Sequence, residues 1–222
     1  QQRPELAGDP LVAAAAAGDL QTLMGQGMRG LLELVGHTHA GMTNAAFSGL
    51  VRRWLRDARH PDFGVPYTRL VYQPMLELLA LLRAHDFRLW IVTGGGAEFV
   101  RVFAEELYGI PPERVIGSTI RLRYGEENGE PALWREPTVD FLDDGDGKPV
   151  GIERAIGRRP IAAFGNSDGD LAMLRWTTAA PGPRLGLLLH NDDGEREVAY
   201  DRHSPFGRLD RGLELAAVHG WS

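Results

Sequence analysis

The chain has 222 residues, 43% of them hydrophobic and 24% charged, and its formal net charge is −6. This composition is typical of a soluble globular protein, and the acidic balance argues against a nucleic-acid-binding protein, which needs a basic face. The absence of cysteine excludes disulfides, thiolate metal sites and a cysteine nucleophile, and no apolar run is long enough to span a membrane. A small phosphorylated ligand stays compatible with this charge, because a metal ion can supply positive charge locally.

The first 60 residues predict helices with glycines such as Gly30 and Gly36 between them. The expected helices are an alanine-rich stretch to Leu23, a stretch from Leu31 to Val35, and a longer one from Asn44 to Ala58. Thr43 fits the N-cap of the third helix, because its hydroxyl can accept a hydrogen bond from an amide of the first turn. A loop from His60 to Pro66 ends this region and is the best candidate for a domain boundary.

Beyond this loop, helices and strands alternate. Pro74 suits the first turn of a helix, and Gly109 suits the end of another. In chain order, we expect a helix from Pro74, a strand Phe87–Val92, a helix Ala97–Tyr108, a hairpin of residues 115–124 and 131–141 with a turn at 126–129, a helix near Gly151–Ile156, a strand Pro160–Phe164, a helix through Leu174 and a strand of residues 185–189. This alternation predicts an α/β fold with a parallel sheet, whose ligands bind at the carboxyl ends of strands.

The run Thr93-Gly94-Gly95-Gly96 directly follows the expected strand Phe87–Val92. A hydroxyl and successive glycine amides that open a helix are suited to bind a phosphate oxygen. A dinucleotide-binding loop is excluded, because the last glycine of that motif would fall at residue 99, which is phenylalanine. The alternative is a glycine-rich turn that only reverses the chain, and these residues alone favour neither reading.

Two further candidates follow along the chain. Lys148 precedes a short helix and could neutralise a phosphate or a carboxylate, although most lysines are solvated surface charges. Asn166, Asp168 and Asp170 follow an apolar strand, and oxygen-bearing side chains at this spacing favour Mg²⁺ binding over the alternative of a turn that caps the next helix.

Taken in order, these motifs resemble a known family. A strand with Thr-Gly-Gly, then a lysine, then a strand with Gly-Asn-x-x-x-Asp resembles motifs two, three and four of the haloacid dehalogenase superfamily, and most closely its phosphoserine phosphatase-like branch. The resemblance extends along nearly the whole chain, including residues 38–43, 163–170 and 190–197. It implies a Rossmann-like parallel-sheet core, residues 66–222, and an N-terminal helical cap, residues 1–65.

The resemblance also implies an activity. Members hydrolyse phosphate monoesters with Mg²⁺ through an aspartyl-phosphate, and a cap of this size implies a small phosphorylated metabolite as substrate. On this basis Thr93, Gly94 and Gly95 would hold the phosphoryl group, and Lys148 would offset charge on the phosphate and the nucleophile. His39 of the cap region is a candidate substrate contact, with a polar residue at a helix end as the alternative.

The same resemblance assigns Asn166, Asp168 and Asp170 to the metal. Many relatives have aspartate where Asn166 stands. The amide oxygen can still bind Mg²⁺, but with one negative charge fewer, so we expect weaker metal binding.

The superfamily's motif one, D-x-D-G-T, has no counterpart before Thr93. Residues 144–147 imitate it, but they follow motif two and lack the threonine, so we expect a polar turn there. The nucleophilic aspartate is therefore expected before Gln1, and the central strand of the sheet, between Phe87–Val92 and Pro160–Phe164, is expected to be absent from this chain. The alternative is a catalytically inactive fragment or a protein that binds phosphate-containing ligands. The sequence indicates no compartment and no oligomeric state.

Overall fold

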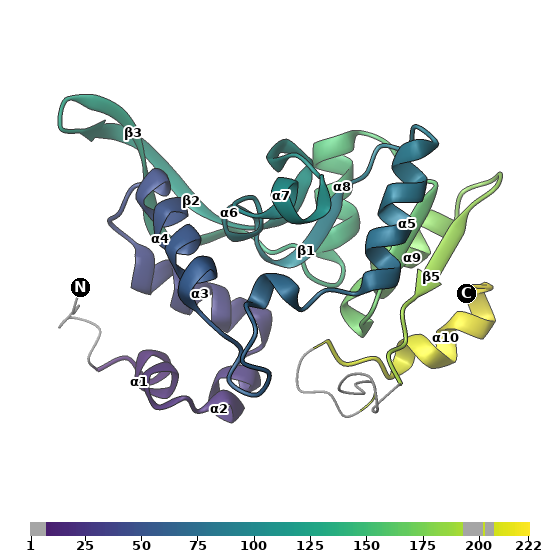
Figure 1. Cartoon of the computed structure of the whole chain (residues 1–222), viewed down its shortest axis with the longest axis horizontal. Helices are drawn as coiled ribbons and strands as arrows, with labels where there is room; N and C mark the ends of the chain where they lie inside the picture. The colour runs from purple at the N-terminus through teal and green to yellow at the C-terminus, as the bar shows by residue number, and fades with distance from the viewer. Residues whose placement is uncertain (1–7, 193–201, 203–206) are drawn as a thin grey trace. The chain divides into compact units, whose positions relative to one another are not determined.

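The computed structural model describes residues 8–192, 202 and 207–222 and shows a mixed α/β fold with small sheets (Figure 1). The chain divides into two units, Gln1–Leu142 and Asp143–Ser222, and each is described by itself. The division into a cap of residues 1–65 and a core of residues 66–222 stays a prediction that rests on the family resemblance.

The first unit begins with four helices, α1 (Pro10–Ala17), α2 (Leu20–Gly25), α3 (Gly27–His39) and α4 (Asn44–Asp57). The alanine-rich stretch is divided because Gly18, with φ of 69°, ends α1. Gly30 and Gly36 lie inside α3, so the expectation that they separate helices is wrong. At Gly36 helix α3 lies close to a strand, since a Cβ there would be in ordinary van der Waals contact with the backbone of Pro137, at 3.5 Å.

The predicted helix starts at Thr43 and Pro74 are confirmed. Thr43 has extended backbone angles, and its hydroxyl accepts a hydrogen bond from the Ala46 amide at 3.2 Å. Pro74 lies in the first turn of α5 (Gln73–Ala84), which follows a 3₁₀ turn, η2 (Tyr67–Arg69).

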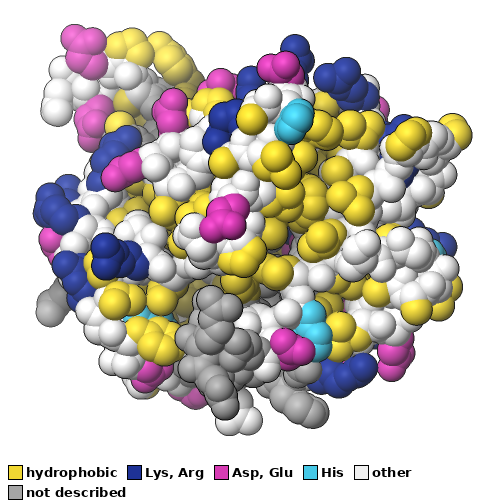
Figure 2. All heavy atoms as spheres, turned by 45° about the vertical axis from the view of Figure 1, so that its right-hand side comes forward, with side chains coloured by type: hydrophobic (Ala, Val, Ile, Leu, Met, Phe, Trp, Pro, Cys, Tyr) yellow, Lys and Arg dark blue, Asp and Glu magenta, His cyan; other side chains and the backbone are white. Residues whose placement is uncertain are grey.

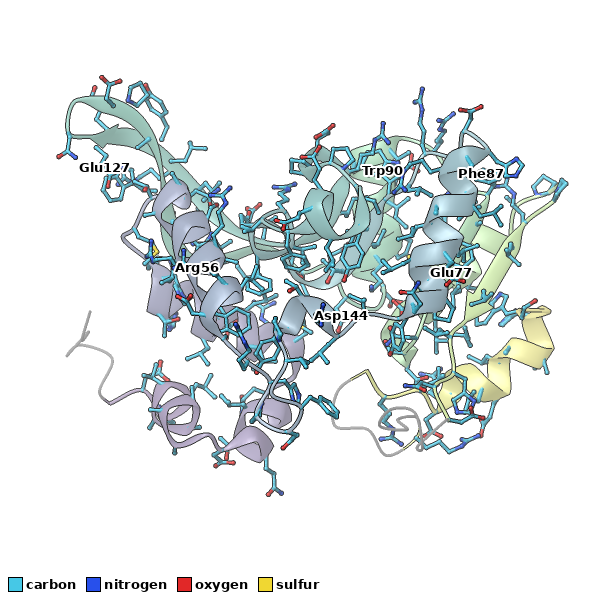
Figure 3. All side chains as sticks on the ribbon, viewed as in Figure 1. Arg56, Glu77, Phe87, Trp90, Glu127 and Asp144 are labelled. Atoms are coloured by element: carbon cyan, nitrogen blue, oxygen red, sulfur yellow. The ribbon has the colours of Figure 1, made fainter. Side chains whose placement is uncertain are left out.

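A three-stranded sheet completes the first unit, with β1 (Ile91–Gly96) parallel to β2 (Val115–Glu127), and β2 antiparallel to β3 (Glu130–Phe141). The hairpin is confirmed, and its strands are longer than expected because the turn consists of only Asn128 and Gly129, which have φ of 55° and 84°. Glu127 lies near the tip of this hairpin (Figure 3).

Two expectations around β1 are wrong. The strand does not begin at Phe87: residues 87–90 form no strand, and Phe87 is 40% exposed and donates its amide to the last turn of α5 (Figure 3). β1 instead begins at Ile91, opposite Val115 of β2, and continues through the glycines to Gly96. The single helix expected over residues 97–108 is two short helices, α6 (Ala97–Val100) and α7 (Ala104–Tyr108), before the 3₁₀ turn η3 (Pro112–Arg114). The aromatic and β-branched residues of this stretch have low helix propensity.

The second unit contains α8 (Gly147–Ile156), β4 (Ala162–Gly165), a 3₁₀ turn η4 (Asp168–Asp170), α9 (Leu171–Thr178), β5 (Leu185–Leu188) and α10 (Arg211–His219). β4 and β5 form a parallel pair. Helix α8 starts earlier than predicted and includes Lys148, and β4 starts two residues later than predicted. Helix α10 was not predicted. Ile152, Leu174 and Leu209 are at most 1% exposed and form the core of this unit.

Large hydrophobic side chains are exposed in both units, for example Leu81 and Ile161. Figure 2 shows hydrophobic side chains at the surface among charged ones. Within the described part of the chain, none of the helices has the length and apolar character that a membrane span requires.

Candidate active site

The glycine run in the first unit forms a bulge in β1. Thr93 pairs with Gly117 and Gly96 pairs with the next residue, Ser118, so Gly94 and Gly95 leave the regular ladder. The bulge is held by two hydrogen bonds: the Gly95 amide donates to the Thr93 hydroxyl at 3.1 Å, and the Ser118 hydroxyl donates to the Gly94 carbonyl at 2.8 Å. Bulges of this kind redirect backbone groups beside functional sites.

The packing in the structure does not explain why the bulge contains glycines. None of Gly94, Gly95 and Gly96 has positive φ. A Cβ on Gly95 would have its nearest neighbour at 3.4 Å and one on Gly96 at 4.0 Å, so both positions have room for a side chain. Glycine costs roughly 0.5–1 kcal/mol of chain entropy relative to alanine in a strand. The space beside these glycines fits a ligand that approaches the backbone closely.

A cavity of about 370 Å³ lies in the same unit, next to the bulge. Gly96 and Ser118 form part of its wall, and the other walls come from α3, α4, α6 and β3. His39 also lines it, so the structure brings this predicted residue beside the end of β1. Its Nδ1 lies 3.1 Å from the Val35 carbonyl oxygen, and its ring packs edge-on against Phe47.

Three polar residues of this cavity were missed by the sequence analysis. Ser118, Glu98 and Arg135 are 0%, 7% and 3% exposed. They come from three different elements, and no sequence motif groups them. The sequence contains one signal: Arg135 falls within an expected strand. An arginine that is buried in a strand needs a partner.

In the second unit, Lys148 and Asp170 form a buried ion pair. The Lys148 Nζ lies 2.9 Å from Asp170 Oδ1, and the two side chains are 6% and 8% exposed. Lys148 projects from the first turn of α8, and Asp170 follows β4. Lys148 is also the only lysine in the sequence, since every other basic residue that is not histidine is arginine. A compact ammonium group therefore occurs only at this buried position.

The other oxygen of Asp170 organises the turn after β4. Oδ2 accepts hydrogen bonds from the Asn166 amide at 2.9 Å, the Ser167 amide at 3.1 Å and the Ser167 hydroxyl at 3.3 Å. Gly165 permits this arrangement, because a Cβ there would lie only 2.5 Å from the Asp170 Cβ. Lys148, Asn166 and Asp170 are thus brought together, as the motif spacing predicts.

Asp168 has a different environment. Its Oδ1 accepts hydrogen bonds from the amides of Asp210 and Gly212 at 3.1 and 2.9 Å, and its Oδ2 accepts one from Arg211 at 3.2 Å. These amides belong to the start of α10, where a helix has amides without partners and a carboxylate is favoured. Asp168 therefore caps a helix that lies about 40 residues further along the chain.

The polar turn expected at residues 144–147 is confirmed: Gly145 has φ of 52°, and the Gly147 amide donates to the Asp144 carbonyl at 2.9 Å. His37 faces Asp9, with 3.7 Å between Nδ1 and Oδ2. Of the segment 190–197, residues 193–197 lie outside the described residues.

The chain was compared with protein families, solved structures and curated proteins. The sequence profile of the haloacid dehalogenase-like hydrolases matches residues 2–175. The chain belongs to this family. Among solved structures, it is similar to a phosphoserine phosphohydrolase-like protein from Francisella tularensis subsp. tularensis SCHU S4, with 17% identity over 97% of this chain and 88% of that chain and a TM-score of 0.45. A comparison with curated proteins gives no match.

Haloacid dehalogenase-like hydrolases are typically magnesium-dependent. The question is therefore whether the residues of the turn after β4 have donor atoms that suit Mg²⁺. Asn166 and Asp170 offer hard oxygen atoms, which Mg²⁺ prefers. In the described part of the chain, however, no three His, Cys, Asp or Glu residues form a cluster that could hold a metal. Mg²⁺ commonly uses one or two protein ligands together with waters and substrate phosphate. The donor set therefore fits Mg²⁺ if a phosphate supplies further oxygens.

Proposed function

We propose that this haloacid dehalogenase-like hydrolase is a magnesium-dependent phosphomonoesterase of the phosphoserine phosphatase-like type that acts on a small phosphorylated molecule. The buried pair of Lys148 and Asp170 at the end of β4 is the observation that supports this most strongly. A buried ion pair is costly to form and adds little stability, so a functional reason for its presence is favoured. Phosphoryl transfer provides one, because it needs positive charge at a fixed position.

In this proposal each group has a separate role. The Thr93 hydroxyl and the Gly94 amide of the bulge bind the phosphoryl oxygens. The Lys148 ammonium offsets negative charge on the phosphate, and Asp170 holds the ammonium in place. Asn166 and Asp170 would hold Mg²⁺, which would supply positive charge to the phosphate. The first aspartate of motif one attacks phosphorus, the ester P–O bond breaks, and the leaving alkoxide takes a proton from the second aspartate. Water, which returns a proton to that second aspartate, then hydrolyses the aspartyl-phosphate to inorganic phosphate and free aspartate.

The nucleophilic aspartate is, in this proposal, not among the 222 residues. Support comes from the sheets. Among the described strands, β1 pairs only with β2, and β4 pairs only with β5. Every residue of β1 is only half-buried, although a parallel strand in the middle of a sheet is covered on both sides. No residue of α5 is fully buried either, despite its apolar face. A further strand that carries motif one would account for the incomplete burial of β1 and α5.

Calorimetry and an activity assay on the 222-residue chain test the proposal. We expect inorganic phosphate to bind in the presence of Mg²⁺, with affinity at least ~10-fold lower in Lys148→Met, since charge-assisted hydrogen bonds contribute about 1.5–3 kcal/mol. Arg154→Met is the matched control, because Arg154 is an exposed cation on the same helix. No release of p-nitrophenol from p-nitrophenyl phosphate is expected.

Turnover by the purified chain would show that the nucleophile lies within these residues and would refute that part of the proposal. Equal phosphate affinity in wild type and Lys148→Met would remove Lys148 from the site. The second candidate, a phosphate-ligand-binding protein without catalysis, is favoured by the missing motif one. It predicts that a longer form with D-x-D-G-T binds phosphate but still has no activity.

A further inference from the structure

A groove of about 800 Å³ lies in the second unit, and three arginines line it. Arg159 follows α8, Arg175 lies on α9, and Arg211 is the first residue of α10, so the positive charges come from three separate elements. Among the described residues, none of the three forms an ion pair. Like charges around one groove repel each other, so stability does not explain why they gather there.

Arg159 is held by contacts that leave its charge available. Its guanidinium carbon lies 3.6 Å from the centre of the Trp176 ring, and its Nη1 donates to the Trp176 carbonyl at 2.8 Å. Both contacts are with neutral groups. A planar guanidinium that is fixed by stacking and by one donated hydrogen bond keeps its other N–H groups for a ligand.

Arg175 and Arg211 have exposed side chains, and in the part of the chain that the structure describes these side chains have no hydrogen-bond partner. Arg211 stands in the first turn of α10, where the helix dipole favours a negative charge over a positive one. The nearby Asp168 directs its oxygens to the amides of residues 210–212 and not to the guanidinium. Local structure therefore gives no reason for a cation at Arg211.

The other residues of the groove indicate the class of its ligand. Two acidic residues line it, Asp146 and Asp168. Since backbone amides bind the oxygens of Asp168, only Asp146 offsets the three guanidinium charges among the described walls, and two positive charges stay uncompensated. Apolar side chains cover the rest, including Leu171, Leu215 and Trp221. The groove therefore suits a molecule with two negative charges and an apolar body.

We propose that this groove binds a small organic dianion whose two charges lie on separate groups, a dicarboxylate, and that Arg159, Arg175 and Arg211 bind it. Guanidinium groups match the planar geometry of carboxylates, and arginines from three elements suit charges that are apart. The volume of about 800 Å³ lies in the range of small-molecule sites. The site goes beyond the proposed function, because it uses none of the residues assigned there to the phosphate or to Mg²⁺.

Calorimetry on the 222-residue chain at pH 8 without Mg²⁺ tests this with three probes that share one aromatic ring. Benzoate has one negative charge, isophthalate has two on separate carboxylates, and phenylphosphonate has two on a single group. We expect isophthalate to bind at least ~10-fold more tightly than either of the others, because only its two carboxylates can reach arginines of different elements together.

Arg175→Gln and Arg211→Gln should each lower the isophthalate affinity at least ~5-fold, since each removes a charge-assisted hydrogen bond. Arg158→Gln is the matched control: Arg158 is exposed, precedes Arg159 and is not a wall of the groove, so the affinity should stay within about 2-fold. Isophthalate should also raise the urea midpoint of the wild type more than that of either groove variant. Circular dichroism checks that each variant is folded.

Three results would overturn the proposal. The first is an isophthalate affinity no higher than that of benzoate or phenylphosphonate. The second is an undiminished isophthalate affinity in Arg175→Gln or in Arg211→Gln. The third is an equal loss in Arg158→Gln, which would show that the net charge of the surface and not the groove attracts the anion.

Discussion

Replacing Lys148 by methionine is expected to lower the free energy of unfolding of the second unit by about 3 kcal/mol, at the lower end of the roughly 3–5 kcal/mol for removal of one partner from a buried ion pair. The structure gives the reason. Asp170 Oδ1 loses the ammonium at 2.9 Å, whereas Oδ2 keeps the amides of Asn166 and Ser167 and the Ser167 hydroxyl. The carboxylate stays buried but keeps the three donors to Oδ2.

A second substitution in the same background separates charge from packing. Asp170→Asn keeps an oxygen for the two backbone amides and removes the unpaired charge, so the double variant should regain about 1–2 kcal/mol relative to Lys148→Met. Urea unfolding at neutral pH, followed by circular dichroism, measures both variants, with Arg154→Met as a control that should change stability by less than about 0.5 kcal/mol. A loss below about 1 kcal/mol for Lys148→Met, or no recovery in the double variant, would refute the buried-pair argument.

Three further outcomes are expected. Asn166→Asp should tighten Mg²⁺ binding in calorimetry with phosphate present, because it restores a negative charge to the turn, and unchanged affinity would count against this ligand. Asp168→Ala should cost about 1–2 kcal/mol and speed hydrogen exchange of amides 210–212, because α10 loses its cap, whereas unchanged exchange would contradict that role. A hydrogen bond from the Leu11 amide lowers the pKa of Asp9 below 3.8, so its stabilisation of α1 is present above that pH and is lost as the pH falls through the lowered pKa. Nuclear magnetic resonance of the Leu11 amide follows this loss, and Asp9→Asn should remove the pH dependence.

The elements that the sequence predicted well are those whose ends are determined by local chemistry. Thr43 caps a helix with its own hydroxyl, Gly109 ends α7 with φ of 62°, and Asn128-Gly129 forms a two-residue turn. Each of these residues has a conformational preference that does not depend on distant parts of the chain.

The strand before the glycine run was misplaced for the opposite reason. Phe87, Leu89 and Trp90 are hydrophobic and favour a strand, whereas glycines have low strand propensity. In the structure, β1 extends over the residues that pair with Val115 to Ser118 of β2. These residues enclose Gly94 and Gly95, which form a bulge, and Phe87 lies outside them. Pairing between segments some 24 residues apart overrides local propensity, and one sequence does not contain that information in readable form.

The residues of the candidate site likewise include some that the sequence could predict and some that it could not. Lys148, Asn166 and Asp170 were predictable because they follow strands and occur in a family's order. Arg135 and Glu98 lie on different elements, and only the folded chain brings them to one cavity, so no spacing rule could find them.

The two groups of polar residues differ in a way that bears on their roles. Around Asp170, both carboxylate oxygens have donors within 3.3 Å, so the charges are fixed before any ligand arrives, which is the arrangement that stabilises charge in a transition state. Around Arg135, the Nε atom is buried and has no hydrogen-bond acceptor among the residues that the structure describes. A satisfied cluster favours chemistry at a fixed position. On this reasoning the buried pair of Lys148 and Asp170 is suited to stabilise charge at a fixed position, in line with the role proposed for it.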